Sequence, residues 1–248
     1  MDVLIYAFAS VFAVSLISLV GVFTLSVNVE KLKTMLIYMV SFSAGALFGD
    51  AFFHLLPEVV EESGFGISVS ISLLAGITIF FVIEKIINIR HSHIPLGEGH
   101  VHTFTLMNLF GDAMHNFIDG LLIGASYLAS IPVGIATTLA VIFHEIPQEI
   151  GDFGVLIHGG FTTKRALFYN FLTALTAVLG TITALFLSTK IQNLTTYLIP
   201  FAAGAFIYIA GSDLIPELHK EKKMTKSIMQ LVTFVLGISV MMGLLLIE

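Results

Sequence analysis

The sequence contains no cysteine and no tryptophan, and only 11% of its 248 residues are charged. Without cysteine there can be no disulfide, no thiol chemistry and no cysteine-type zinc site. An average soluble domain carries roughly 25% charged residues. This chain has far fewer, together with 56% hydrophobic residues and a mean hydropathy of +0.98. The composition therefore excludes an ordinary soluble domain, and most of the surface must face lipid.

Long apolar runs follow one another along the chain. Because about 20 apolar residues cross a bilayer as a helix, they predict an all-α integral membrane protein with about eight transmembrane helices. The first run is longer than a secretory signal and lacks a basic start, so we expect it to be a retained helix. The predicted spans are 3–27, 34–59, 66–88, 103–129, 132–158, 164–188, 194–217 and 226–247.

Lysine and arginine lie almost entirely in the loops on one side of this arrangement. Cytoplasmic loops carry an excess of these residues, so this side is predicted to be inside and both termini outside, in a plasma (inner) membrane. Lys190 is the exception, and it lies on the side where Glu58, Glu61 and Glu62 gather. The basic residues of the inner loops are Lys31, Lys33, Lys85, Arg90, Lys164, Arg165, Lys220, Lys222, Lys223 and Lys226.

An internal repeat relates the second predicted span to the seventh. "FSAGALFGDAFFHLLPE" (Phe42–Glu58) aligns without gaps with "FAAGAFIYIAGSDLIPE" (Phe201–Glu217). The two spans cross the membrane in opposite directions, so the repeat is inverted, as in many secondary transporters, whose substrate sites lie near mid-membrane. The alternative is that alanine- and glycine-rich helices ending in Pro-Glu recur by chance.

Polar residues concentrate in the two spans between the halves, within "GDAMHNFIDG" and "HEIPQEIGD". Spacings of three and four place such residues on one face of each helix. Counting at 1.5 Å per residue from the turn near Ala129–Pro132 places His115 and His144 at the same level, about 20 Å below that turn. The faces so predicted are Asp112, His115 and Asp119 in one helix, and His144, Gln148 and Asp152 beside Glu145 and Glu149 in the other.

Placing these groups in hydrocarbon costs several kcal/mol each unless something compensates. Pro147 also frees the carbonyl of Phe143 from its helical hydrogen bond, which is tolerated only against protein or a wet cavity. Two imidazoles with carboxylates and amides form a ligand set for a borderline divalent cation such as Zn²⁺ or Fe²⁺, and the oxygen ligands extend the range to Mn²⁺. Helix-tying hydrogen bonds and a proton relay are the alternatives.

The motifs "HNFIDG" and "HEIPQEIGDF", backed by "GALFGDAFFHLLPE" and "AGAFIYIAGSDLIPE", resemble those of the ZIP family of divalent metal transporters. The resemblance implies a 3+2+3 inverted repeat, in which an elevator-like shift carries Zn²⁺, or Fe²⁺, Mn²⁺ or Cd²⁺, toward the cytoplasm. Within a single domain 1–248 it gives repeats 1–90 and 161–248, a cytoplasmic loop 91–102 and a central pair 103–160. The implied metal ligands are His115, Asn116, Asp119, His144, Glu145 and Gln148.

Two positions depart from the family pattern. Gln148 stands where many members have His or Glu, and Thr176 stands where some supply a Glu to a second metal. Both departures remove a charged ligand, which argues against a second fully occupied metal site.

Other polar residues are candidates for the ion pathway, with structural roles as the alternative. Asp112, Glu149 and Asp152 are candidates for additional metal ligands or proton acceptors. His54 and Glu58 are candidates for residues at the entrance. Exit or collection roles are candidates for Asp213, His158, His91, His93, His100 and His102.

The partners expected are divalent metal ions and the lipid bilayer, with a homodimer left open and no nucleic acid. No catalytic or cofactor-binding residue is predicted. An intramembrane zinc hydrolase is the rival, since "HEIPQ" is reminiscent of the HExxH motif, although Gln148 replaces the second His. Metal uptake without hydrolysis would separate the two.

Overall fold

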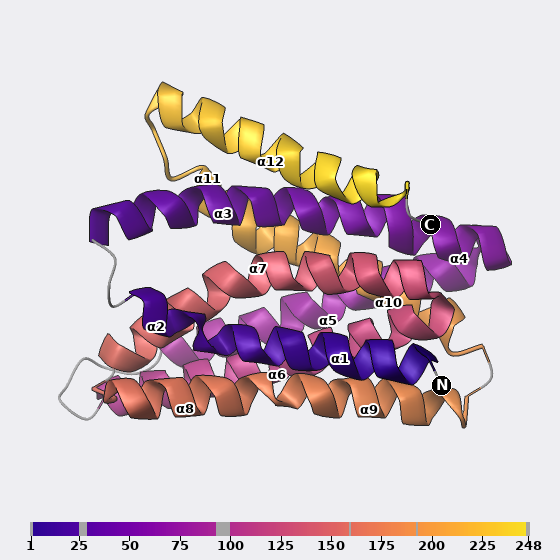
Figure 1. Ribbon diagram of the computed structural model, residues 1–248, viewed down its shortest axis with the longest axis horizontal. Coiled ribbons are helices and arrows are strands. Elements are labelled where there is room, and N and C mark those ends of the chain that lie inside the picture. Colours follow the sequence, from indigo (N-terminus) through magenta and orange to yellow (C-terminus); the bar gives the residue numbers. More distant parts are fainter. Residues whose placement is uncertain (1, 25–28, 93–99, 159, 192, 247–248) are drawn as a thin grey trace.

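The computed structural model describes residues 2–24, 29–92, 100–158, 160–191 and 193–246, and the regular structure in these ranges is helical. The long helices lie side by side along the longest axis (Figure 1). This confirms the all-α class.

The chain up to His158 supplies five of the predicted spans. The first is α1 (Asp2–Ile17), a short 3-10 turn η1 (Ser18–Val20) and α2 (Gly21–Thr24). The second is α3 (Val29–Asp50), a π-helical segment η2 (Ala51–Leu55) and α4 (Leu56–Ser63). The next three are α5 (Ile67–Ser92), α6 (His100–Ala129) and α7 (Ile131–His158). Helices α5 and α6 thus extend into the predicted loop 91–102.

The remaining three spans follow the same plan. The sixth is α8 (Thr163–Ala174) followed by α9 (Thr176–Ser188). The seventh is α10 (Thr195–Tyr208), a second π-helical segment η3 (Ile209–Leu214) and α11 (Ile215–Leu218). The eighth is α12 (Met224–Leu244). Each lies within a few residues of its predicted range.

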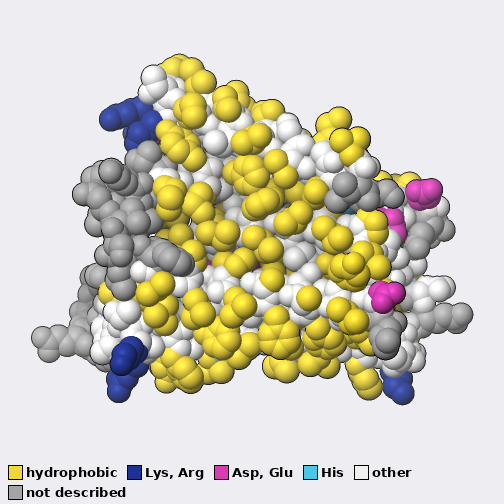
Figure 2. All heavy atoms as spheres, in the orientation of Figure 1, with side chains coloured by type: hydrophobic (Ala, Val, Ile, Leu, Met, Phe, Trp, Pro, Cys, Tyr) yellow, Lys and Arg dark blue, Asp and Glu magenta, His cyan; other side chains and the backbone are white. Residues whose placement is uncertain are grey.

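Within the described residues, six of these segments are long and apolar enough to cross a membrane, and α6 and α7 are not among them. The two measure 30 and 28 residues and carry the polar motifs, so their crossing stays a prediction. Figure 2 shows hydrophobic side chains covering the middle of the molecule, with basic groups mainly at its left end and acidic groups at its right. Helix α1 starts and α12 finishes toward the right end (Figure 1).

Two bundles of helices pack against each other. In one, α3 packs on α12 and α5 on α10; in the other, α6 packs on α7 and α9, with α1 and α8 alongside. The contact between α3 and α7 is the most extensive link between the bundles. The central pair α6 and α7 therefore belongs to one bundle and faces the other.

Glycines bring the helices of the first bundle into backbone contact. A Cβ added at Gly45 of α3 would lie 2.0 Å from the carbonyl oxygen of Phe234 in α12, and one at Gly204 of α10 would lie 2.0 Å from that of Leu73 in α5. Small residues allow such close approach between membrane helices. Gly45 and Gly204 are equivalent in the aligned repeat, so the two helix pairs are built in the same way.

The two π-helical segments also occupy equivalent positions of the repeat, Ala51–Leu55 and Ile209–Leu214. Each precedes a proline, Pro57 or Pro216, which lacks an N–H and clashes with the carbonyl four residues earlier. That carbonyl belongs to Phe53 in one segment and to Ser212 in the other. A local widening to π geometry accommodates the proline without ending the helix.

Candidate metal centre

The site is built by the tight connection between α6 and α7, which are separated by Ser130 alone. The Ser130 N–H donates to the Ser126 carbonyl, and the Gly134 N–H donates to the Ser130 carbonyl, so the backbone bonds continue through the turn. The helices return antiparallel, and the Nε2 atoms of His115 and His144 lie 3.3 Å apart. This confirms that the two imidazoles share one level.

Two carboxylates complete a compact group with these imidazoles. Asp119 Oδ2 lies 3.0 Å from His144 Nε2 and 3.6 Å from His115 Nε2. Glu145 Oε1 lies 3.6 Å from both imidazole nitrogens. The group of His115, Asp119, His144 and Glu145 thus offers one ligand atom from each residue, all within 4.8 Å of one another.

The spacing of these four atoms fits a tetrahedral zinc ion. With Zn–N and Zn–O bonds of about 2.0–2.2 Å, the ligand atoms of a regular tetrahedron lie about 3.3–3.6 Å apart. Five of the six ligand separations are those given above, between 3.0 and 3.6 Å. The four atoms therefore surround a space of the size that a small dication requires.

The hydrogen bond of His144 through Nδ1 directs its Nε2 toward the other members of the group. Its Nδ1–H donates to the Ala140 carbonyl at 3.1 Å, so the neutral ring presents the Nε2 lone pair to Asp119. Metal-binding histidines commonly donate their other N–H to a carbonyl in this way. Among the described residues, Glu145 Oε1 and Asp119 Oδ1 are buried without a hydrogen bond. Converging lone pairs of this kind need a cation or shared protons between them.

Because the group is buried, its net charge is costly unless an ion of opposite charge balances it. His144, Asp119 and Glu145 have side chains 2%, 0% and 1% exposed, whereas His115 is 17% exposed. Two carboxylates and two neutral imidazoles carry a formal charge of −2, which a divalent ion would balance. His115 is the most exposed member of the group.

The prediction about Pro147 is confirmed by a contact between the two bundles. The carbonyl of Phe143, which lacks its usual N–H donor because residue 147 is proline, accepts a hydrogen bond from the hydroxyl of Ser43 in α3. The freed carbonyl therefore faces protein, as expected within a membrane. Ser43 escaped the sequence analysis, because nothing in the sequence fixes how α3 is rotated toward α7.

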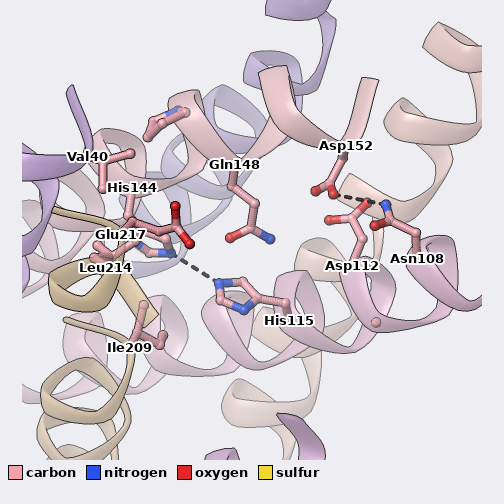
Figure 3. Close-up of a pocket in the computed structure, with 12 residues that line it drawn as sticks. Val40, Asn108, Asp112, His115, His144, Gln148, Asp152, Ile209, Leu214 and Glu217 are labelled. Atoms are coloured by element: carbon pink, nitrogen blue, oxygen red, sulfur yellow. Dashed lines mark hydrogen bonds between the residues drawn. The ribbon is translucent and has the colours of Figure 1, made fainter. Parts of the chain in front are cut away.

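A cavity of about 370 Å³ is lined by the histidine pair and by residues of several other helices (Figure 3). His144, Gln148 and Asp152, the row predicted on α7, all line it, and so do His115 and Asp112 of α6. Glu217, whose side chain is 57% exposed and pairs with Lys220, also lines it. The cavity thus joins the buried group to the basic end of the molecule.

Asn116 and Glu149 are not part of the group. The Asn116 amide donates to Asp112 Oδ1 at 2.7 Å, and its role as a ligand stays a prediction. Glu149 is turned toward α8, where the Asn170 amide donates to its Oε2 at 2.5 Å. The Thr176 hydroxyl is engaged with the carbonyls of Ala113 and Thr173.

The outlying candidates lie away from this group or beyond what the structure describes. His54 is buried, and its Nε2 is hydrogen-bonded to the Met241 carbonyl at 2.9 Å, which supports the structural alternative; entrance roles for His54 and Glu58 stay predictions. Outside the described structure lie residue His93 and the side chains of His91, His100, His102, His158 and Asp213.

The helices are suited to a bilayer, and they enclose a buried group that could hold a divalent cation. Together these features indicate a membrane transporter of metal ions. A family model described as ZIP Zinc transporter matches residues 1–103 and 98–245. The chain therefore belongs to the ZIP zinc transporter family. Membership supports divalent metal transport as its general function and does not favour the hydrolase alternative.

Individual relatives agree with this assignment. The zinc transporter zipt-7.1 of Caenorhabditis briggsae is 30% identical over 85% of this chain and 71% of its own length. The zinc transporter ZIP13 of Pongo abelii is 32% identical over 91% of this chain and 74% of its own length. The zinc transporter ZIP6 of Homo sapiens is 41% identical, but the match covers 53% of this chain and 18% of that protein.

Proposed function

We propose that this chain carries a divalent cation, Zn²⁺ first among Zn²⁺, Fe²⁺, Mn²⁺ and Cd²⁺, across the membrane toward the cytoplasm. The observation that carries the proposal is the convergence of four ligand atoms from His115, Asp119, His144 and Glu145. Their separations fit a tetrahedral dication, and their formal charge would balance one. Relatives named as zinc transporters support zinc as the first choice.

The two sides of the site differ in how accessible they are. On one side, the cavity leads from the histidine pair toward Glu217 at the basic end, which the charge rule assigns to the cytoplasm. On the other side, after His115 in α6 and before His144 in α7, Leu122, Ile123 and Val141 are 0% exposed. We infer an inward-open state, sealed toward the outside and ready to release its ion into the cytoplasm.

Alternating access requires the site to open to the other side in turn. The central pair packs within the bundle of α1, α6, α7, α8 and α9 and faces the bundle of α3, α5, α10 and α12. Movement of the first bundle against the second would carry His115 and His144 past the second bundle, as in other transporters built from repeats. The Ser43–Phe143 hydrogen bond crosses this boundary.

The test is uptake of Zn²⁺ by purified protein in liposomes, with His115→Ala and His144→Ala as variants. Each variant should lose more than tenfold in uptake rate, because even groups that merely orient metal ligands contribute about 10–100-fold. His219→Ala is the matched control, since this His is exposed at the end of α11, outside the four-residue group. Competition by Fe²⁺, Mn²⁺ and Cd²⁺ in the same assay ranks the substrates.

Uptake at the parent rate by a folded His115→Ala or His144→Ala variant would show that the ion does not pass through this group. Equal losses in all three variants would point to a general effect of histidine replacement. Thermal denaturation of each variant in detergent separates loss of the site from loss of the fold.

A further inference from the structure

A second set of polar groups lines the same cavity, nearer the basic end of the molecule than the histidines. Asp112 lies three residues before His115 on α6, and Asp152 lies eight residues after His144 on α7, so both are displaced from the histidines toward the basic end. Figure 3 shows the two carboxyl groups facing each other, with Asn108 beside them and Gln148 pointing into the space between this set and the histidines. The groups that could bind a cation here are carboxylates and side-chain amides, which would bind it through oxygen.

Each carboxylate is held by an asparagine through one oxygen. The Asn116 amide donates to Asp112 Oδ1 at 2.7 Å, and the Asn108 amide donates to Asp152 Oδ1 at 2.9 Å. The two carboxyl groups face each other (Figure 3) and repel each other when both are ionised. Among the ion pairs of the described residues, neither acid is paired with lysine or arginine.

The second oxygen of Asp112 points to a ligand. Asp112 is 4% exposed and lines the cavity, and its Oδ2 is buried without a hydrogen bond in the described part of the chain. The Gln148 amide and the Thr173 hydroxyl lie near the same carboxyl group. A buried carboxylate oxygen left without a donor is costly. A cation held between Asp112 and Asp152 would remove that cost and their mutual repulsion together.

We propose that Asp112 and Asp152 form a second cation site made of oxygen ligands, with the Gln148 and Asn108 amides alongside. This proposal rests on the proposed function, because the site lines the same cavity as the histidine group. Its occupant is a partly hydrated divalent cation. Oxygen ligands with retained water suit Mn²⁺, Mg²⁺ or Ca²⁺ and bind Zn²⁺ less selectively than imidazole does. An ion leaving the histidines would exchange nitrogen ligands for oxygen and water here.

Mn²⁺ distinguishes the two sites, because pulsed electron paramagnetic resonance detects whether nitrogen is bound to it. Three variants of the full chain in detergent are compared with the parent: Asp112→Asn/Asp152→Asn, His115→Ala/His144→Ala, and the exposed-acid control Asp2→Asn/Glu61→Asn. We expect the histidine variant to retain bound Mn²⁺ without nitrogen coupling. The Asp112→Asn/Asp152→Asn variant should weaken this Mn²⁺ binding by at least about tenfold, and the control should match the parent.

The outcomes separate this site from the histidine group. If the Asp112→Asn/Asp152→Asn variant, folded by its melting profile, binds Mn²⁺ like the parent, or if the histidine variant binds none, the oxygen site is wrong. Zn²⁺ binding could be unchanged by the loss of His115 and His144 and yet require Asp112 and Asp152. In that case the assignment of the histidine group as a metal site is wrong, and the oxygen site stands. Combining the acid and histidine substitutions should abolish binding of both ions.

Discussion

At the scale of single residues, the chemistry of the site depends on which hydrogen bonds the backbone accepts. His144 donates through Nδ1 to the Ala140 carbonyl, and this bond turns Nε2 toward Asp119 and His115. One turn further on, Pro147 takes away a donor from Phe143, and Ser43 of the opposite bundle supplies another. The same stretch of α7 thus orients one metal ligand and forms a link to α3.

Ser43→Ala tests this link. The Phe143 carbonyl would be left buried without a donor, and such a loss costs about 1–3 kcal/mol. Ser41→Ala is the matched control, because the Ser41 hydroxyl donates to the Gln230 carbonyl inside α12, where the helix supplies that carbonyl with a second donor. In detergent, thermal denaturation should place Ser43→Ala below Ser41→Ala. Equal midpoints would mean that the Phe143 carbonyl has another donor.

The residues of the site were predictable to different degrees. Counting from the tight turn gave the shared level of His115 and His144, because both lie in regular helix. Asn108 lies four residues before Asp112 on the same face, so the spacing rule could have found it. Ser43 and Asn170 could not be found in this way, because their roles depend on how helices distant in sequence are rotated against each other.

At the scale of elements, contact between α3 and α12 depends on having no side chain at Gly45 and Gly237. A Cβ at Gly237 would lie 2.2 Å from the carbonyl oxygen of Phe42, whereas one at Gly243 in the same helix would meet nothing within 4 Å. The backbones of the two helices therefore touch at Gly237 and not at Gly243. This contact explains why glycine is tolerated inside a helix that it otherwise weakens.

Gly237→Ala should consequently destabilise the protein, with Gly243→Ala as the control within α12. Overpacking costs typically about 1–3 kcal/mol, and this clash is with backbone, which cannot rotate away. Gly243→Ala should be neutral or stabilising by up to about 1 kcal/mol, from helix propensity. Denaturation midpoints in detergent measure both. A Gly237→Ala protein as stable as Gly243→Ala would show that the two helices are not this close.

The elements themselves were largely predictable, because hydropathy and length set the eight segments. The breaks inside them were not. Pro57 and Pro216 gave a reason to expect irregular helix, but a proline can kink or end a helix as well as widen it. The π geometry of η2 and η3, and the break between α8 and α9 at Leu175, depend on packing that no local pattern shows.

At the scale of the whole molecule, the charges at the two ends decide which side of the membrane the cavity between the bundles faces. The four-residue group is open toward the end that carries Glu217 and the lysines after it. If that end is cytoplasmic, the structure is inward-open and the oxygen-lined site lies on the way out. If the orientation is reversed, the structure is outward-open and the same cavity becomes the entrance.

The absence of cysteine makes this orientation directly measurable, because a single introduced cysteine is the only thiol in the chain. Glu61→Cys and Lys222→Cys place an exposed thiol near the acidic and the basic end, respectively. With a membrane-impermeant maleimide, intact cells should label Glu61→Cys at once and Lys222→Cys only after permeabilisation, since lysine-rich loops stay inside. The cysteine-free parent gives the background. Labelling of Lys222→Cys in intact cells would reverse the orientation, and labelling of both variants on the same side would contradict the span count between them.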